Sequence, residues 1–181
     1  MKIKQVILSK SYTGFYFDDQ KAIKGGAKLD GFTYVGEPKT PGFTSIRQPG
    51  EAISIQLVLE DGSVAVGDCA AVQYSGAGGR DPLFLADEFI PFIEKEIKPL
   101  LIGEDVSKFK ELALKYDHLQ VNGKRLHTAI RYGITQALLK ATALANKLTM
   151  AEVIRKEYHI PEKDYHPVAV FTQSGDDRYN N

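Results

Sequence analysis

The sequence has a single cysteine, no tryptophan, no net charge and no long hydrophobic run, and these absences limit what the protein can be. Cys69 has no second cysteine for an internal disulfide, which suits a reducing compartment. Lys and Arg total 23, as do Asp and Glu, and this balance argues against a dedicated nucleic-acid-binding protein. No stretch approaches the roughly 20 apolar residues of a membrane span, and the N-terminal apolar run is too short for a signal peptide. We therefore expect a cytoplasmic protein without nucleic-acid or membrane partners.

The residues that are present have the composition of a soluble globular domain. Of 181 residues, 43% are hydrophobic and 25% are charged, so the chain can bury a core. This length is typical of one domain, or of one domain and a fragment of another.

Short apolar segments in the first half predict an antiparallel β meander. Residues 3–8 form an apolar stretch that suits a first strand. Apolar and polar residues alternate over 53–59, which is the pattern of a half-buried strand. Asp61 and Gly62 follow as the favoured dipeptide of a tight turn, and the alternation resumes at Val64. We expect a hairpin here.

Between these strands, residues 11–49 are rich in glycine and predict turns and irregular loop. A solvated linker would not carry so many aromatic residues, so the segment should cover an apolar surface. It either packs on its own domain or serves as a lid or interface. The aromatic residues are Phe15, Tyr16, Phe17, Phe32, Tyr34 and Phe43.

The second half has the spacing of helices. Asp81 and Pro82 resemble an N-cap followed by proline at the first helical position. Pro91 should bend this first helix. Its apolar residues recur every four positions, at Leu85, Phe89, Ile93, Ile97 and Leu101.

Three further helices are predicted after the first. Asp105 is a candidate cap for a helix that ends at about Leu119, and an apolar stripe over 126–148 predicts a long one. Thr149 and Glu152 match a capping box that opens the last helix, which should end near position 158. Strands followed by helices indicate an α+β fold.

One apolar segment does not fit this plan. Residues 167–171 (PVAVF) have the pattern of a buried strand but follow the helices and have no evident partner in the meander. We expect them to be the first strand of a structure that is completed elsewhere.

The densest group of unusual residues, 67–81, contains a glycine-rich run followed by Arg80. Its spacing matches neither the P-loop nor the dinucleotide-binding fingerprint. A loop that reaches over a neighbouring site is the better interpretation, because several adjacent glycines are costly to order.

No complete catalytic apparatus is visible from residue types alone. The histidines lack metal-ligand spacing, and His127 is expected to be structural. The adjacent carboxylates at 18–19 and 176–177 are candidate Mg²⁺ ligands. Neighbours on a strand point in opposite directions, so neither pair is a chelate by itself, and we expect solvated turns at both. Cys69 should be buried and unreactive. Gln73 and Gln173 follow strands, where sites are commonly built.

Long runs of this sequence resemble methylaspartate ammonia-lyase. They extend over essentially the whole chain and are far more specific than a short motif. The runs are TGFYFDDQKAIK (13–24), DGFTYVGEP (30–38), GDCAAVQYSGAGGRDPLFLA (67–86), VNGKRLHTAIRYGITQALL (121–139), TMAEVIRKEY (149–158) and VFTQSGDDRY (170–179).

The resemblance implies the fold of the enolase superfamily. In that fold an α+β capping domain, an antiparallel β meander followed by helices, precedes a barrel of the triosephosphate-isomerase type. Residues 1–160 would be the capping domain, and 161–181 would begin the barrel with its first strand and the following loop. A barrel needs about 250 residues, so we expect the remainder to lie outside this chain.

The resemblance also implies the chemistry. The family reversibly eliminates ammonia from threo-3-methylaspartate to give mesaconate, with Mg²⁺, in glutamate fermentation, a route of amino-acid degradation. Its lysine and histidine bases and its three metal-binding carboxylates lie further along the barrel. We therefore expect no catalytic residue and no metal ligand in this chain, and a second chain that carries the barrel. Dimers of such assemblies are expected, and this chain alone should be inactive.

Two residues match substrate-contacting positions of the family, Gln73 and Gln173, and Phe171 is a third predicted substrate-binding residue. Gln173 would orient a substrate carboxylate, because a glutamine amide both donates and accepts hydrogen bonds without titrating. Gln73 would bound the pocket around the amino group, and Phe171 would line the pocket beside them. Two alternatives to one chain of a split lyase stay open: a free-standing ligand-binding or regulatory module derived from the capping domain, and a truncated form of a longer protein.

Overall fold

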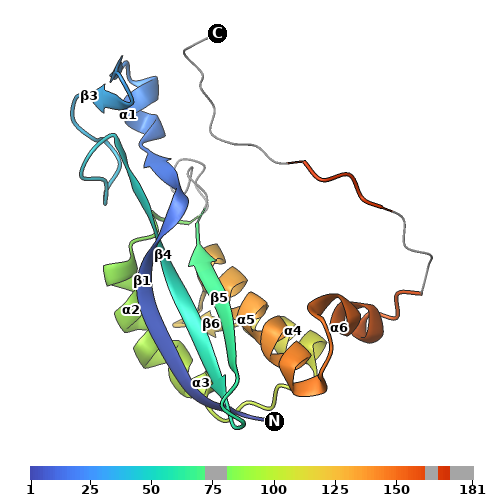
Figure 1. The fold of residues 1–181 in the computed structure, drawn as a ribbon. Coiled ribbons are helices and arrows are strands. Elements are labelled where there is room, and N and C mark those ends of the chain that lie inside the picture. The colour runs from blue at the N-terminus through green and yellow to red at the C-terminus, as the bar shows by residue number, and fades with distance from the viewer. Residues whose placement is uncertain (72–80, 162–166, 172–181) are drawn as a thin grey trace.

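A three-stranded antiparallel sheet forms the centre of the fold in a computed structural model that describes residues 1–71, 81–161 and 167–171. The strands are β1 (Ile3–Asp18), β4 (Arg47–Leu59) and β5 (Val64–Ala70), in the order β1-β4-β5. Helices pack against one face of this sheet (Figure 1). The predicted α+β fold is confirmed.

The β4–β5 hairpin forms where the alternating pattern predicts it. Gly62 has a φ of +85°, which glycine adopts without strain, and the Asp61 carboxylate accepts a hydrogen bond from the Ser63 N–H at 3.0 Å. The inward-facing residues of β4 are fully buried, and they are Ile53, Ile55, Leu57 and Leu59.

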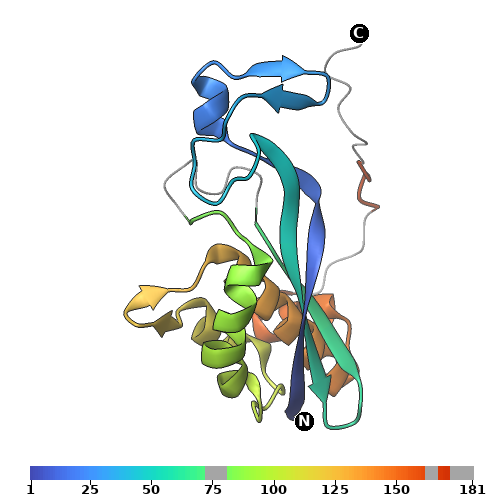
Figure 2. The same cartoon turned by 90° about the vertical axis from the view of Figure 1, so that its left-hand side faces the viewer.

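The prediction of irregular structure over 11–49 is wrong for much of that segment. Strand β1 continues to Asp18 in pairing with β4, and a small unit then forms from α1 (Gln20–Lys24), β2 (Lys28–Asp30) and β3 (Thr33–Val35). Figure 2 shows this unit at the end of the long β1–β4 pair that lies opposite the N-terminus. Gly14 lies within β1 and the other glycines of the segment lie outside the strands and the helix, so a high glycine content did not prevent regular structure.

The aromatic residues of this segment divide into two groups. Phe17 and Phe43 are buried in the core, as expected for packing on their own domain. Phe15, Tyr16 and Phe32 are exposed by 63%, 45% and 58%. For these three residues the lid or interface interpretation stays a prediction.

The first helical segment is continuous but irregular. It comprises α2 (Ala86–Phe92), a π-helical turn η1 (Ile93–Ile97) and α3 (Lys98–Leu101). Pro91 lies inside α2, and the π-helical turn begins two residues later. The irregularity expected at Pro91 is therefore a local change from α-helix to π-helix.

The prediction that Asp81 and Pro82 open this helix is wrong. The helix begins at Ala86, and the Ala86 N–H donates to the carboxylate of Glu51 on β4 at 2.7 Å. Asp81 accepts instead from the first residue of a different helix, as described below.

Helix α4 (Phe109–Asp117) also has a cap that the sequence pattern missed. The Asp105 carboxylate accepts from the Ser107 N–H, within the preceding turn, and does not cap the helix. Glu157, far along the chain, accepts from the Phe109 and Lys110 N–H groups at 2.8 and 2.5 Å. The helix ends two residues before the predicted position, and β6 (Gln120–Val121) and β7 (Lys124–Arg125) follow as a short hairpin.

The last two helices confirm their predictions. Helix α5 (Thr128–Asn146) packs across β5 and β4, and α6 (Met150–Glu157) begins with the capping box. The Glu152 N–H donates to the Thr149 hydroxyl at 3.2 Å, and the Thr149 N–H donates to the Glu152 carboxylate at 2.7 Å. Among the described residues, no helix is long and apolar enough to cross a membrane.

Residues 167–171 do not form the predicted buried strand within this chain. They have no assigned secondary structure, and Val168, Val170 and Phe171 are each more than 80% exposed. Figure 1 shows the segment apart from the sheet. A strand needs neighbours for its backbone groups, and the described part of this chain supplies none.

Candidate functional site

The three predicted substrate-binding residues are not brought together in the described part of the chain. Gln73 and Gln173 lie outside the described residues, as does the carboxylate pair at 176–177. Phe171 is described, and its side chain is 84% exposed. What the structure does describe is how the chain is fixed immediately before position 72 and after position 80.

On the upstream side, strand β5 fixes the chain in the core. Cys69 is fully buried and Ala71 is 8% exposed. The Asp68 N–H donates to the side-chain oxygen of Gln136 on α5 at 2.9 Å. Burial, with a smaller effect of the Asp68 charge, raises the pKa of the Cys69 thiol to about 12. The prediction that Cys69 is buried is confirmed. The raised pKa disfavours the thiolate, which is the nucleophilic form, and the lack of reactivity stays a prediction.

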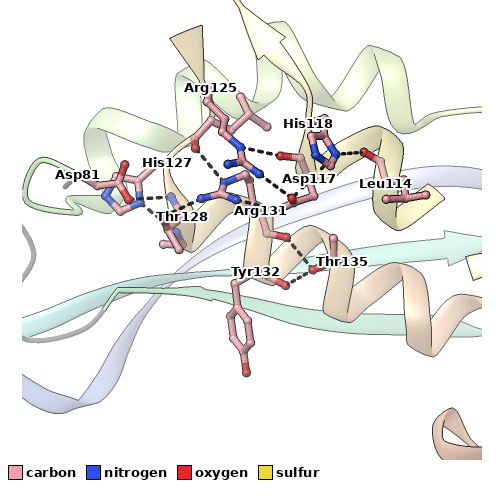
Figure 3. Close-up of polar contacts among 12 residues, drawn as sticks. Asp81, Leu114, Asp117, His118, Arg125, His127, Thr128, Arg131, Tyr132 and Thr135 are labelled. Atoms are coloured by element: carbon pink, nitrogen blue, oxygen red, sulfur yellow. Dashed lines mark hydrogen bonds and ion pairs between the residues drawn. The ribbon is translucent and has the colours of Figure 1, made fainter. Parts of the chain in front are cut away.

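On the downstream side, residues 81 and 82 are tied to the start of α5 (Figure 3). The Thr128 N–H donates to the Asp81 carboxylate at 3.1 Å. His127 is the N-cap of α5, and its Nδ1 accepts from the Ala129 N–H at 3.0 Å. Its Nε2 lies 3.0 Å from the carbonyl oxygen of Pro82. We call Asp81, Pro82 and His127 the α5 clasp.

The environment of His127 favours the neutral ring. Its ring centroid lies 5.0 Å from that of Phe84 and 5.2 Å from that of Phe89, and the residue is 7% exposed. Burial lowers the pKa of His127, although the Pro82 carbonyl and the Asp81 charge oppose this effect. Because Nδ1 accepts, the proton of the neutral ring is on Nε2. The prediction of a structural histidine is confirmed.

Behind the clasp, Arg131 joins the start of α5 to the end of α4. Its guanidinium donates to the Asp117 carboxylate at 2.7 Å and to the Thr128 hydroxyl at 3.0 Å. Arg125 of β7 donates to the same carboxylate at 2.6 Å (Figure 3). The two guanidinium groups hold the pKa of Asp117 below its usual range even though burial opposes them.

At the other end of the sheet, Arg47 fixes the small α1–β2–β3 unit. Its guanidinium makes two hydrogen bonds to the Asp18 carboxylate, at 2.7 and 2.8 Å, and a third to the Phe32 carbonyl oxygen at 2.8 Å. It also lies 5.0 Å from the ring centroids of Phe32 and Tyr34. The planar guanidinium suits paired bonds and stacking together.

Asp19 is the second fixed point of this unit. It is 1% exposed, and its carboxylate accepts from the N–H groups of Lys21 and Ala22 in α1. It also accepts from the Lys39 N–H at 2.5 Å, the Thr40 N–H at 2.9 Å and the Thr40 hydroxyl at 2.6 Å. The expectation of a solvated turn at Asp18 and Asp19 is therefore wrong, because both carboxylates are structural.

The polar side chains described above serve to hold the fold together. In the described ranges, no three side chains of His, Cys, Asp or Glu come together to hold a metal ion. Asp18 and Asp19 are occupied by internal partners, and the ring nitrogens of His127 both have partners.

Sequence reasoning missed several residues that fix this structure. Arg47, Arg131 and Glu157 each bond a partner that is at least 14 positions away. No local pattern marks such a pair, and only the fold brings the partners together.

Comparison with known proteins places this architecture in a family. A family profile described as "Methylaspartate ammonia-lyase N-terminus" matches residues 1–159. The methylaspartate ammonia-lyase of Clostridium tetanomorphum is 65% identical over 181 residues, which is 100% of this chain and 44% of that protein.

Solved structures agree. The Mg complex of β-methylaspartase from Clostridium tetanomorphum matches with a TM-score of 0.93 at 65% identity, over 99% of this chain and 43% of that one. The Citrobacter amalonaticus enzyme containing (2S,3S)-3-methylaspartic acid matches with a TM-score of 0.87 at 61% identity, over 89% of this chain and 39% of that one. The chain thus spans less than half the length of these relatives. It belongs to the methylaspartate ammonia-lyase family and corresponds to the N-terminal part of its members.

Proposed function

We propose that this chain is the capping component of a methylaspartate ammonia-lyase that eliminates ammonia from threo-3-methylaspartate to give mesaconate. The observation that carries the proposal is the 65% identity to a curated methylaspartate ammonia-lyase along the full 181 residues. The bound (2S,3S)-3-methylaspartic acid of the Citrobacter amalonaticus structure supports the substrate class. Identity at this level to lyases favours this function over a free-standing module.

The barrel and the proton-transfer bases would come from a second chain. Relatives have more than half of their length beyond the region that this chain matches, which supports a missing barrel. In this proposal residues 1–160 form the capping domain, and residues 161–181 enter the barrel as its first strand and loop. The assembly is cytoplasmic and pairs into a dimer.

Mg²⁺ belongs to the partner chain in this proposal. The related Clostridium tetanomorphum structure is an Mg complex. The described residues of this chain do not fit such an ion, because no three potential ligands converge in them. A bound Mg²⁺ would stabilise negative charge on a substrate carboxylate.

The chain's own contribution would be to bind and orient the substrate. Gln173 is proposed to hold a substrate carboxylate, and Gln73 to bound the pocket at the amino group. Phe171 would line the pocket once the barrel covers it, and its present exposure of 84% leaves the ring free to do so. A neutral amide can hold a carboxylate or an ammonium at any pH near neutrality.

The test is to measure mesaconate formation from 3-methylaspartate and Mg²⁺ by ultraviolet absorbance. The purified chain alone should give no turnover, and turnover should appear when a chain carrying the family's barrel is added. Sustained activity of the chain alone would contradict the placement of the bases on a second chain. Absence of activity in the reconstituted mixture, with a stable complex present, would contradict the lyase function.

A further inference from the structure

We propose that the α5 clasp is a pH-sensitive junction, in which neutral His127 joins the backbone at Pro82 to the N-terminus of α5 and protonated His127 releases the Ala129 N–H. The junction sets the local stability of the start of α5 and does not depend on the lyase chemistry. His127 makes two hydrogen bonds there, at 3.0 Å to the Ala129 N–H and 3.0 Å to the Pro82 carbonyl oxygen.

The two bonds use the two ring nitrogens in opposite roles. Nδ1 must accept and Nε2 must donate, so only one tautomer of the neutral ring satisfies both. Protonation places a hydrogen on Nδ1, which then faces the Ala129 N–H as a second donor. The Pro82 bond survives protonation, whereas the cap on α5 is lost.

The surroundings make protonation unfavourable in the folded state. The ring packs against Phe84 and Phe89, which carry no charge. Among the described residues, two charged groups act on the ring. Asp81 favours the protonated form and Arg131 disfavours it, and burial outweighs Asp81. Asp117 pairs with Arg131 at 2.7 Å and so offsets part of the Arg131 charge.

The Thr128 amide, which donates to Asp81, is an internal reference for the Ala129 amide within the same junction. Asp81 accepts from the Thr128 N–H, one residue before Ala129. Hydrogen bonds from Thr128 hold the pKa of Asp81 below its usual range against the opposing effect of burial. Asp81 therefore stays ionised at pH 5 and keeps accepting from Thr128, whereas protonation of His127 removes the acceptor of the Ala129 N–H. A change confined to the Ala129 side identifies the histidine as the switch.

The experiment is amide hydrogen exchange of the full 181-residue chain between pH 7.5 and pH 5. The Ala129 protection factor should be level above about pH 7. Below about pH 6.5, the ordinary histidine value, it should fall by up to tenfold per pH unit. The Thr128 protection factor should fall less. In the variant His127→Asn the Ala129 protection factor should not vary with pH, because an asparagine side chain caps a helix without titrating.

His118→Asn is the matched control. His118 has a side chain that is 68% exposed and bonds within α4, and the variant should retain the pH dependence of the Ala129 amide. If His127→Asn does not fold, ¹⁵N NMR of the wild-type imidazole decides. Neutral His127 protonated on Nε2, with titration that tracks the Ala129 amide, supports the proposal. Level Ala129 protection down to pH 5, or a neutral ring protonated on Nδ1, overturns it.

Discussion

Gly67 of β5 and Gly133 of α5 face each other so closely that neither position has room for a side chain. A Cβ on Gly67 would collide with the carbonyl oxygen of Gly133. A Cβ on Gly133 would collide with the sulfur and backbone nitrogen of Cys69. The two backbones touch at this crossing, so α5 lies close against β5, the strand that precedes position 72.

This crossing predicts that Gly133→Ala destabilises the fold. Alanine is normally favoured over glycine in a helix by about 1 kcal/mol. Here the added Cβ would clash with the backbone and the buried side chain of Cys69, which cannot move freely. The free energy of unfolding should therefore fall by about 1–3 kcal/mol. Urea unfolding followed by circular dichroism measures the change.

Gly14→Ala is the control for this prediction. Gly14 lies in β1, and a Cβ there would meet no atom within 4 Å. The control should change the free energy of unfolding by less than about 0.5 kcal/mol. If Gly133→Ala were as stable as the control, the close approach of α5 and β5 would not be a constraint.

Asp19 predicts an acid-sensitive contribution to stability. Burial alone would raise the pKa of Asp19, but hydrogen bonds from Thr40, Lys39 and Ala22 outweigh it, so that the pKa is lowered. A carboxyl group whose folded pKa is lowered stabilises the fold above its unfolded pKa of about 3.9, and this stabilisation is lost as the pH falls through the folded value.

Asp19→Asn should therefore cost about 1–3 kcal/mol at pH 7, because an amide hydrogen would face backbone N–H groups. The difference from wild type should shrink as the pH falls below about 4. Thermal unfolding between pH 7 and pH 3 measures it, with Asp30→Asn at an exposed position as the control. A difference that stays constant down to pH 3 would show that the charge of Asp19 is not involved.

How far the sequence predicted the fold depends on whether each element is determined locally. The β4–β5 hairpin, α5 and the capping box of α6 were predictable because their patterns and caps lie within a few residues. Asp81 was misassigned because its partner, Thr128, lies 47 positions away. The cap that Glu157 gives to α4 was missed for the same reason, because Glu157 lies 48 positions after Phe109. At the candidate site, Gln73 and Gln173 were marked by their place after predicted strands, their roles came from the family resemblance, and both stay predictions.

For the assembled enzyme, we expect Gln173→Ala and Gln73→Ala to differ in effect. Loss of an oriented amide at Gln173 should cost about 2–4 kcal/mol of transition-state stabilisation, a fall of roughly 30-fold to 10³-fold in turnover. Gln73→Ala should be milder and should widen tolerance for larger amines, because it removes part of a pocket wall. Steady-state kinetics of the reverse reaction, the addition of ammonia or an alkylamine to mesaconate, distinguishes the two variants. Wild-type kinetics in Gln173→Ala would exclude that residue from the site.

In the two-chain assembly proposed above, residues 167–171 should gain stability from contact with the barrel chain. Val168, Val170 and Phe171 are exposed by 85%, 89% and 84%. Leaving a large apolar side chain in water forfeits roughly 1.5–3 kcal/mol per residue, and unpaired strand backbone promotes aggregation. A permanent complex that covers this segment should bury more than about 2,000 Å² in total.

The measurement is hydrogen exchange of the chain alone and of the complex with a barrel chain. Alone, the amides of residues 168–171 should exchange within seconds, whereas the amide of Ile55, at the centre of β4, should be protected and serves as the internal standard. In the complex, the 168–171 amides should become protected, because a barrel strand is hydrogen-bonded on both sides. Size-exclusion chromatography would report aggregation of the free chain. A well-behaved free monomer with protected amides at 168–171 would show that this segment is satisfied internally, and the two-chain assembly would lose its main physical support.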